Sequence, residues 1–395
     1  MRTGAPLMLA IVAFGACSAS ASAASLPGGF SEHAITGNIT RGTAMAFSPD
    51  GKLFVLEQGG TIEVYQGSGP GNWTRVRANF FVNTPLNVDS FDERGLLGIA
   101  FDPDYSTNRF VYVYYTVGSG QPHNRIARYK ANANGDAALA GSARTIMDLE
   151  PLSAGNHNGG ALAFGPDGKL YVAVGDNANS ANAQSIGNRL GKILRLNPSP
   201  NNPIPSSNPT SIDGIGGTPT GVNRAIWCAG LRNPFTFAFK PGTSVMYIND
   251  VGQNTFEEID VGAAGANFGW GLTEGPFNQG SFPDFTPPIA YYHHSDDSQS
   301  FPENNNFTGF AITGGAFYVP DTNTFGAGFT GDYFFADFIN GWIRRYDPNL
   351  QRITRFATNI DGPVALCVGD DGALYYLART SQGSSAGRVF RVQRS

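Results

Sequence analysis

Residues 47–55 read FSPDGKLFV, and the same phrase returns as FGPDGKLYV over residues 164–172 and as VGDDGALYY over residues 368–376. Each copy contains the end of an apolar strand, a tight turn in which Asp and Gly tolerate left-handed backbone angles, and a second strand of alternating pattern. The phrase therefore predicts a β-hairpin. A single hairpin cannot bury its apolar face, so the return of the phrase predicts a repeated unit.

Weaker copies of the phrase begin at Phe101, Phe239 and Phe317, and further strands are predicted after several copies, at 61–65, 193–197, 342–346 and 388–392. Small antiparallel sheets repeated along a whole chain are typical of a propeller, and about six units fit this length. We therefore predict an all-β fold, a six-bladed β-propeller of four-stranded antiparallel blades, whose first blade is closed by strands from both termini. The alternative is a pair of β-sandwiches, which do not repeat their turn phrase across a chain.

The composition is that of a turn-rich β-protein. The 395 residues include 51 Gly and 25 Pro, and 14% of them are charged, against about 25% in average soluble proteins. A net charge of −5 without Lys or Arg clusters excludes a nucleic-acid partner, because binding phosphates requires clustered cations. Propellers of this length form single units, so residues 24–395 are predicted to be one domain. Cys228 and Cys367 either pair or remain free buried thiols.

The first 23 residues have the layout of a secretory signal peptide. A positive charge precedes an apolar run over residues 7–17, and small residues follow over 21–23. We predict cleavage after Ala23 and a secreted or periplasmic protein. The alternative is a lipid anchor on Cys17. No apolar segment is long enough to span a membrane as a helix.

The first candidate for chemistry is His157, in the segment NHNGG over residues 156–160 that directly precedes the second copy of the phrase. This position places His157 where a blade enters its innermost strand, close to the propeller axis. A histidine without a second histidine at metal-ligand spacing suits a general base. The alternative is a hydrogen-bonded structural histidine. Glu93, in an acid-rich turn before another strand, is either a polar contact in the site or a turn-stabilising residue.

Two further loops are rich in polar and glycine residues. In GLRNP, residues 230–234, Arg232 offers a rigid charged fork for a carboxylate or an oxyanion, with the Asn233 amide beside it. The alternative for Arg232 is a structural ion pair. In DVGQNTFEEI, residues 250–259, main-chain carbonyls are candidates for binding a hard cation such as calcium. The adjacent acids Glu257-Glu258 are equally compatible with solvent-facing positions.

These phrases in this order resemble the glucose/sorbosone dehydrogenase family, which includes soluble aldose dehydrogenases dependent on pyrroloquinoline quinone. The matching motifs are ERGLLGIAF from Glu93, HNGGALAFGPDGKLYV from His157, GLRNP from Gly230, and DVGQNTFEEID from Asp250 with NFGW from Asn267. The resemblance implies a six-bladed propeller that oxidises the anomeric C1 hydroxyl of aldoses to lactones. It also implies pyrroloquinoline quinone and calcium as cofactors, a small sugar substrate and an external electron acceptor.

The resemblance further implies a role for each matching catalytic residue. His157 corresponds to the base that takes the proton of the anomeric hydroxyl while hydride passes to the quinone. Asn156 corresponds to a polar neighbour of that base. Arg232 and Asn233 correspond to the pair beside the quinone oxygens, with Arg232 polarising the carbonyl that receives the hydride.

The expected cofactor ligands are matched only in part. Gly252 and Gln253 correspond to the residues whose main-chain carbonyls hold calcium. Glu93 corresponds to a cofactor contact, but the characterised enzymes have Gln there. A negative charge therefore enters a site that is built for an anionic cofactor.

The later blades of those enzymes supply a Lys and paired Arg residues that neutralise the carboxylates of the cofactor. This chain has no Lys over 337–341 and no Arg in the stretch before Gly362, which leaves Arg344, Arg345 and Arg379 as cations without an assigned place. A buried polyanion without cations is strongly disfavoured. The rival function is therefore a non-catalytic carbohydrate- or protein-binding propeller that has lost quinone binding. A calcium-dependent lactone hydrolase is a third alternative, but the sequence shows no convergent set of Asp, Glu and Asn ligands for it.

Overall fold

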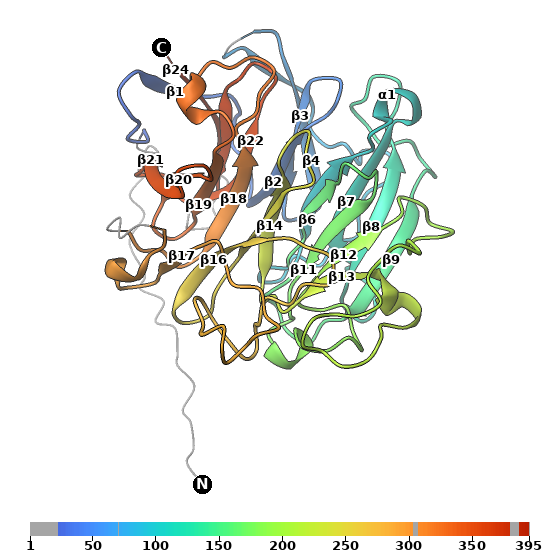
Figure 1. Ribbon diagram of the computed structural model, residues 1–395. Coiled ribbons are helices and arrows are strands. Elements are labelled where there is room, and N and C mark those ends of the chain that lie inside the picture. Colours follow the sequence, from blue (N-terminus) through green and yellow to red (C-terminus); the bar gives the residue numbers. More distant parts are fainter. Residues whose placement is uncertain (1–22, 70, 303–306, 380–386, 395) are drawn as a thin grey trace.

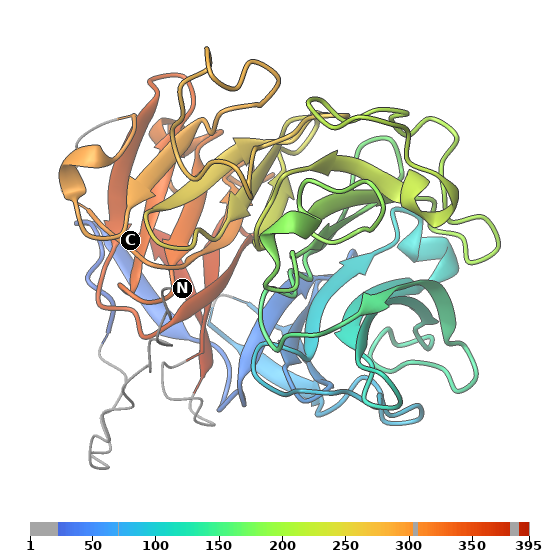
Figure 2. The same cartoon turned by 90° about the horizontal axis from the view of Figure 1, so that it is seen from below.

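The computed structural model describes residues 23–69, 71–302, 307–379 and 387–394. These residues form six antiparallel sheets of four strands each, arranged in a ring (Figures 1 and 2). The innermost strands of neighbouring sheets contact each other all the way round the ring. The predicted six-bladed propeller is therefore confirmed. We number the blades 1 to 6 in the chain order of their innermost strands.

The first three blades follow one another along the chain, each from its innermost to its outermost strand. Blade 1 consists of β2 (Gly42–Phe47), β3 (Lys52–Glu57), β4 (Thr61–Gly67) and β5 (Trp73–Arg77). Blade 2 consists of β6 (Leu96–Phe101), β7 (Phe110–Thr116), β8 (His123–Lys130) and β9 (Arg144–Pro151). Blade 3 consists of β10 (Leu162–Phe164), β11 (Leu170–Val174), β12 (Lys192–Leu196) and β13 (Ile226–Ala229).

The last three blades complete the ring. Blade 4 consists of β14 (Pro234–Phe239), β15 (Met246–Asp250), β16 (Phe256–Val261) and β17 (Ala290–His293). Blade 5 consists of β18 (Ile312–Phe317), β19 (Tyr333–Asp337), β20 (Trp342–Asp347) and β21 (Arg352–Ala357). Blade 6 consists of β22 (Pro363–Val368), β23 (Leu374–Ala378), β24 (Arg388–Arg394) and β1 (Phe30–Ala34). Helices in the described residues are α1 (Tyr105–Asn108) and short 3-10 turns at Ser180–Asn182, Gly221–Ala225, Asp297–Gln299 and Ala327–Phe329.

The repeated phrase is the connection between the innermost and second strands of a blade. In blade 1, Phe47 ends β2 and Lys52 begins β3, and the main-chain N–H of Ser48 donates to the Lys52 carbonyl at 2.8 Å. Gly51 has a φ of 80°, which glycine adopts without steric cost. The strands expected after the phrase are the third strands β4, β12, β20 and β24. One more strand lies outside each of them.

The aromatic residue that begins the phrase packs between blades. Its ring contacts an aromatic ring on the second strand of the preceding blade, with centroids 4.8–5.2 Å apart, in the pairs Phe47–Tyr375, Phe101–Phe54, Phe164–Tyr112, Phe239–Tyr171 and Phe317–Tyr247. Such aromatic pairs contribute about 0.5–1.5 kcal/mol each beyond the area they bury. The phrase therefore fixes a hairpin and also its packing on the neighbouring blade.

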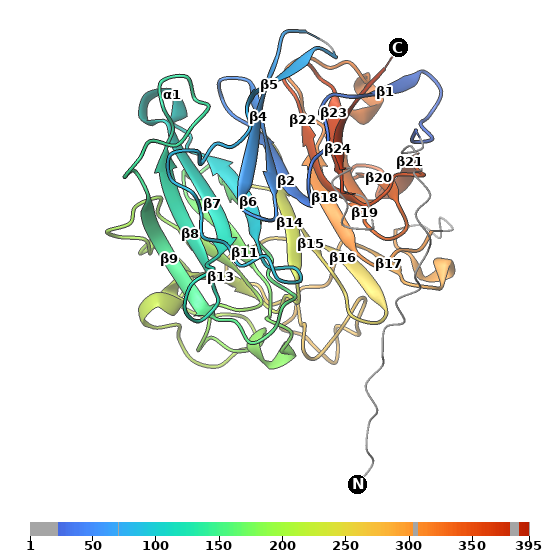
Figure 3. The ribbon, with the colours of Figure 1, turned by 180° about the vertical axis from the view of Figure 1, so that it is seen from behind.

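Blade 6 combines the first strand of the chain with its last three strands. Strand β1 pairs antiparallel with β24, from Phe30 opposite Arg394 to Ala34 opposite Phe390 (Figure 3). The expected closure by both termini is present, but its place in the first blade is wrong. Blade 1 already has four consecutive strands of its own, so β1 completes the last blade instead.

Cys228 lies on β13 and Cys367 on β22, and both thiols are free. Burial raises the pKa of each thiol, so neither is a reactive thiolate. Among the described residues, no helix has the length and apolar character needed to cross a membrane. The predicted signal peptide up to residue 22, including the candidate lipid anchor Cys17, lies outside the described residues.

Candidate active site

The six innermost strands surround a cavity of about 510 Å³ on the propeller axis. Every blade contributes to its wall, as Thr43 does from β2, Thr236 from β14 and Leu366 from β22. The volume lies within the range of roughly 300–1,000 Å³ that is typical of small-molecule sites. Loops at the ends of the strands add four charged residues to the wall: Arg41, Asp92, Glu93 and Arg379.

Loops from three blades meet beside this cavity in one hydrogen-bonded network. The carboxylate of Glu93 accepts the main-chain N–H of His157 at 2.8 Å, and the His157 imidazole contacts Asp176. The main-chain N–H of Asp176 donates to the Arg232 carbonyl at 2.8 Å, and Nη1 of Arg232 donates to the Val251 carbonyl at 2.9 Å. His157 and Arg232 do not line the cavity themselves; their neighbours do, namely Glu93, Gly159, Asn233 and Val251.

The imidazole of His157 is held by a buried carboxylate. Nδ1 of His157 lies 2.7 Å from Oδ1 of Asp176, and Oδ2 of Asp176 accepts a hydrogen bond from Nε1 of Trp270 at 2.8 Å. The side chains of His157 and Asp176 are only 9% and 1% exposed. Because a carboxylate only accepts hydrogen bonds, Nδ1 is the nitrogen that donates to Asp176, and in the neutral imidazole the lone pair is then on Nε2. His157 also has a φ of 55°, a left-handed conformation that is uncommon for a non-glycine residue.

Sequence reasoning does not identify Asp176, although the sequence carries a signal for it. Asp176 stands two residues after β11, the strand that contains the end of the second phrase copy. Strands β10 and β11 are antiparallel, so the residues after β11 lie at the same end of blade 3 as the NHNGG segment before β10. An acid at this position is therefore a candidate partner for His157.

Asp250 fixes the turn that carries Arg232 and Asn233. Its two carboxylate oxygens accept the main-chain N–H groups of Arg232 at 2.9 Å and of Asn233 at 2.7 Å. The guanidinium of Arg232 lies over the Trp270 ring, 5.6 Å from its centroid, and donates to a carbonyl rather than to a carboxylate. Its Nε is buried and has no hydrogen-bond partner in the part of the chain that the structure describes. An unsatisfied buried donor of this kind favours a ligand or a water beside it.

Burial shifts two acids of this network toward their neutral forms. It raises the pKa of Asp250 to about 7, against the opposing effect of its two main-chain hydrogen bonds. The walls of the cavity likewise raise the pKa of Glu93, although the hydrogen bond from the His157 N–H opposes this shift. The shift favours the neutral form of Glu93, which is closer in charge to the Gln that the resemblance implies at this position.

The loop with the expected calcium ligands is shaped by Glu274. One carboxylate oxygen of Glu274 accepts the main-chain N–H groups of residues 253–256 at 2.9–3.3 Å. Burial acts to raise the pKa of Glu274, but these four hydrogen bonds outweigh it and lower the pKa. No hydrogen bond from another described residue uses the carbonyls of Gly252 and Gln253. Among the described residues, no three or more His, Cys, Asp or Glu side chains are grouped to hold a metal ion.

Of the other residues considered for the site, some line the cavity and others do not. Asn156 is half-buried and does not line the cavity. Arg344 and Arg345 lie on β20, the third strand of blade 5, where Arg344 stacks on the Phe307 ring and Arg345 pairs with an acid. Of the three cations without an assigned place, only Arg379 lines the cavity.

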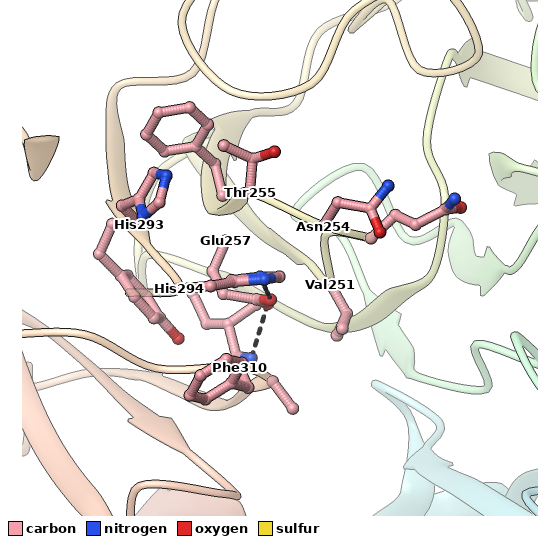
Figure 4. A network of polar contacts seen from close by, with 12 residues as sticks. Val251, Asn254, Thr255, Glu257, His293, His294 and Phe310 are labelled. Carbon is pink, nitrogen blue, oxygen red and sulfur yellow. Dashed lines mark hydrogen bonds and ion pairs between the residues drawn. The ribbon is translucent and has the colours of Figure 1, made fainter. Parts of the chain in front are cut away.

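A second polar network lies between blades 4 and 5 (Figure 4). Nε2 of His294 lies 2.8 Å from Oε1 of Glu257, whose other oxygen accepts the main-chain N–H of Ile312 at 2.9 Å. The His294 ring packs 5.2 Å from the ring of Phe310. Glu257 and Glu258 are both buried, so their solvent-facing alternative is wrong. The network fixes the start of β18 beside the cavity wall.

Comparison with known proteins agrees with the sequence motifs. The family model "Glucose / Sorbosone dehydrogenase" matches residues 39–389. Aldose sugar dehydrogenase YliI of Escherichia coli is 30% identical over 247 residues, which cover 60% of this chain and 61% of that protein. Quinoprotein glucose dehydrogenase B of Acinetobacter calcoaceticus is 28% identical over 269 residues, covering 61% of this chain and 52% of the relative. The matches thus span between half and two thirds of these two relatives.

The fold is shared with solved structures. The crystal structure of an oxidoreductase (glucose dehydrogenase) from Thermus thermophilus superposes with a TM-score of 0.72 at 26% sequence identity. The superposition covers 92% of this chain and 100% of that chain. The likeness extends over the whole propeller rather than over isolated blades.

Proposed function

The chain belongs to the glucose/sorbosone dehydrogenase family, and from this membership we propose that it oxidises the anomeric C1 hydroxyl of an aldose to a lactone, with hydride transfer to pyrroloquinoline quinone. One observation carries the proposal above the others. The buried His157–Asp176 pair stands beside the axial cavity, in the same network as Arg232. One nitrogen of its imidazole contacts a carboxylate, and no hydrogen bond from another described residue uses the other nitrogen, which in the neutral ring can accept a proton.

His157 acts as the general base. Asp176 keeps the proton on Nδ1, so Nε2 accepts the proton of the C1 hydroxyl as hydride leaves C1. An imidazolium then forms, and the Asp176 carboxylate stabilises its charge. The hydrogen bond from Nε1 of Trp270 holds the carboxylate in the orientation that this requires. General-base catalysis of this type contributes about 10²- to 10⁴-fold to the rate.

The residues beside the cavity fit the quinone. Pyrroloquinoline quinone, when bound, supplies the carbonyl carbon that accepts the hydride. Arg232 has an unsatisfied buried Nε, and the Asn233 amide lines the wall, so both offer donors to an oxygen that gains negative charge. Glu93 lines the same wall, and Asn156 adjoins the base in sequence; we retain both as cofactor contacts.

Calcium completes the proposal. The carbonyls of Gly252 and Gln253 are not used by hydrogen bonds within the described chain, and calcium prefers oxygen ligands of this kind. Glu274 fixes the loop by binding four of its main-chain N–H groups, so the carbonyl positions are set before a cation arrives. Main-chain carbonyls would therefore be the calcium ligands, and the Glu274 side chain would hold the loop that carries them.

The proposal is tested by adding calcium and pyrroloquinoline quinone to the purified protein and measuring dye reduction with glucose and several other aldoses. We expect turnover in the wild type and a loss of about 10²-fold or more in His157→Ala. The matched control is His33→Ala, because His33 is exposed on the outermost strand β1. Dye reduction that is unchanged in His157→Ala would exclude His157 as the base.

The rival function has a distinct outcome in the same experiment. If the wild type does not bind the quinone in a titration with calcium present, the chain is a non-catalytic carbohydrate- or protein-binding propeller. Glycan and protein-partner screens would then replace the dye assay.

We also propose that the protein acts outside the cytoplasm, where it passes electrons to an external acceptor. The layout of residues 1–23 supports export. Mass spectrometry of the exported protein should find a mature chain that begins at Ala24. An acylated Cys17 at the N-terminus would establish the lipid-anchored alternative instead.

A further inference from the structure

Two arginine side chains reach the axial cavity from neighbouring blades. Arg41 directly precedes β2 of blade 1, and Arg379 directly follows β23 of blade 6. The innermost strands of these two blades contact each other. Neither arginine belongs to a motif that the family resemblance connects with the cofactor.

The side chain of Gln58 contacts Arg379 directly and shares a main-chain acceptor with Arg41. Gln58 is fully buried, and its Oε1 accepts a hydrogen bond from Nη2 of Arg379 at 2.5 Å. Its Nε2 donates to the main-chain carbonyl of Asp92 at 2.6 Å. Nη2 of Arg41 donates to the same carbonyl at 3.4 Å and to the Ser90 carbonyl at 3.3 Å. The two guanidinium groups are therefore part of one fixed arrangement.

Within the described chain, neither guanidinium forms an ion pair with a carboxylate; their hydrogen bonds go to carbonyl and amide oxygens. Two acids share the cavity wall, but the Glu93 carboxylate accepts the His157 N–H and the Asp92 carboxylate lies against Gly155. Burial, together with the positive charge of Arg41, lowers the pKa of Arg379. The two cations therefore repel each other, and an anion bound between them would relieve the repulsion.

We propose that Arg41 and Arg379 form a carboxylate-binding pair that holds carboxylate groups of the quinone cofactor. The inference rests on the proposed function, because it assigns residues to the cofactor named there. Guanidinium groups suit this ligand, since their fork of N–H donors matches the geometry of a carboxylate.

The position of Arg379 explains how the pair replaces the expected cations. The resemblance implies arginines in the stretch before Gly362 and a lysine within residues 337–341, and this chain has neither. The main-chain N–H of Arg379 donates to the Gly362 carbonyl at 2.8 Å. Arg379 thus lies just after β23, directly beside the residue that precedes β22, where the arginines are missing. A cation therefore enters the cavity wall from the end of β23 rather than from the start of β22.

The test is an equilibrium titration of pyrroloquinoline quinone, followed by protein fluorescence in the presence of calcium. The proteins are the wild type, Arg41→Gln, Arg379→Gln, the double variant and Arg144→Gln, a matched control whose arginine is exposed on the outermost strand β9. We expect each cavity variant to bind the quinone about tenfold or more weakly, and the control to bind it normally. The affinity of the double variant should also depend less on salt than that of the wild type.

The trimethyl ester of the quinone is a second probe, because it keeps the ring and loses the carboxylate charges. All variants should bind the ester as the wild type does. If the glutamine variants fail to fold, as judged by circular dichroism, Arg41→Lys and Arg379→Lys retain the charge. These lysine variants should bind the acid form of the quinone more tightly at low salt than at high salt. If salt does not change the affinity of the wild type or of the lysine variants for the acid form, the proposal is overturned.

The remaining outcomes separate the two proposals. If the wild type binds the quinone and the glutamine variants bind it equally well, the arginine pair is wrongly assigned and the proposed function stands. If those variants bind the quinone normally but lose binding of glucuronate, the pair serves an acidic sugar instead, and the inference is again wrong. If the wild type does not bind the quinone at all, the proposed function fails, and the inference fails with it.

Discussion

Replacing Asp176 with Asn should invert the proton position on His157. The carboxylate of Asp176 accepts one hydrogen bond from Nε1 of Trp270 and contacts Nδ1 of His157. Asn has a single acceptor oxygen, and the indole N–H can only donate, so that oxygen stays on Trp270 and the amide NH₂ turns toward His157. Nδ1 must then act as the acceptor and Nε2 must carry the proton. Nε2 is thereby lost as the base.

The size of the effect follows from these contacts. A hydrogen bond to a charged group contributes about 1.5–3 kcal/mol, which corresponds to roughly 10- to 150-fold in rate. A wrong tautomer costs more, as the comparable substitution in a serine protease triad lowers kcat by about 10⁴-fold. We therefore expect kcat in Asp176→Asn to fall by about 10²- to 10⁴-fold with little change in the KM for the sugar.

The assay is dye reduction by the reconstituted enzyme, with quinone binding measured separately by fluorescence. The matched control is Asp148→Asn, because Asp148 is half exposed on the outermost strand β9, pairs with Arg125 and does not line the cavity. Quinone affinity should be unchanged in both variants. A kcat in Asp176→Asn within threefold of the wild type, with normal quinone binding, would refute the assignment of the pair as the catalytic base.

Three further predictions concern charge in buried places. Glu93→Gln should remove the pH dependence of quinone affinity. Burial raises the pKa of Glu93, so the affinity of the wild type should fall by about tenfold as pH rises above the usual range of a Glu carboxyl and the carboxylate ionises. Parallel affinity curves of the wild type and the variant across this ionisation would contradict the prediction. Lys192→Met should lower the free energy of unfolding in urea by about 3 kcal/mol or more, because the fully buried ammonium donates at 2.7–2.9 Å to three main-chain carbonyls, and a loss under 1 kcal/mol would argue that they find other donors. Asp260→Asn should raise the thermal unfolding temperature at pH 8 more than at pH 5 in chelator-treated buffer. Both oxygens of Asp260 lack a hydrogen-bond partner in the described chain, and burial raises its pKa well above the usual value. The folded state thus keeps a proton that the unfolded chain loses above about pH 4, and stability falls as pH rises from there through the raised pKa; equal shifts at both pH values would contradict this.

Local sequence signals predict the propeller well. The phrase at Phe47, Phe164 and Val368 and its weaker copies mark all six junctions between innermost and second strands. In the three clear copies, a tight turn and parts of both flanking strands are encoded within nine residues. The placement of β1 in blade 6 rather than blade 1 is not encoded locally. It depends on which sheet lacks a fourth strand, and that is known only once all strands are paired.

The candidate site is predictable to a similar extent. His157, Arg232 and Asn233 lie in motifs, and the structure connects them in one network. Asp176 and Arg41 escape sequence reasoning because their roles come from contacts across a blade or between blades. Nothing in the residues around Arg41 distinguishes it from a surface cation; its neighbour Arg379 is 338 positions away in the chain.

The pairing of β1 with β24 has a consequence for biosynthesis. Strand β1 has no partner until β24 has been synthesised. Blade 6 therefore stays incomplete, and the ring stays open, until β24 has been made. Truncated products that lack β24 lose both a strand and the docking place of another. Final assembly must therefore wait for the complete polypeptide, and contacts between such distant segments form slowly. If the chain is exported before it folds, this last step takes place on the far side of the membrane.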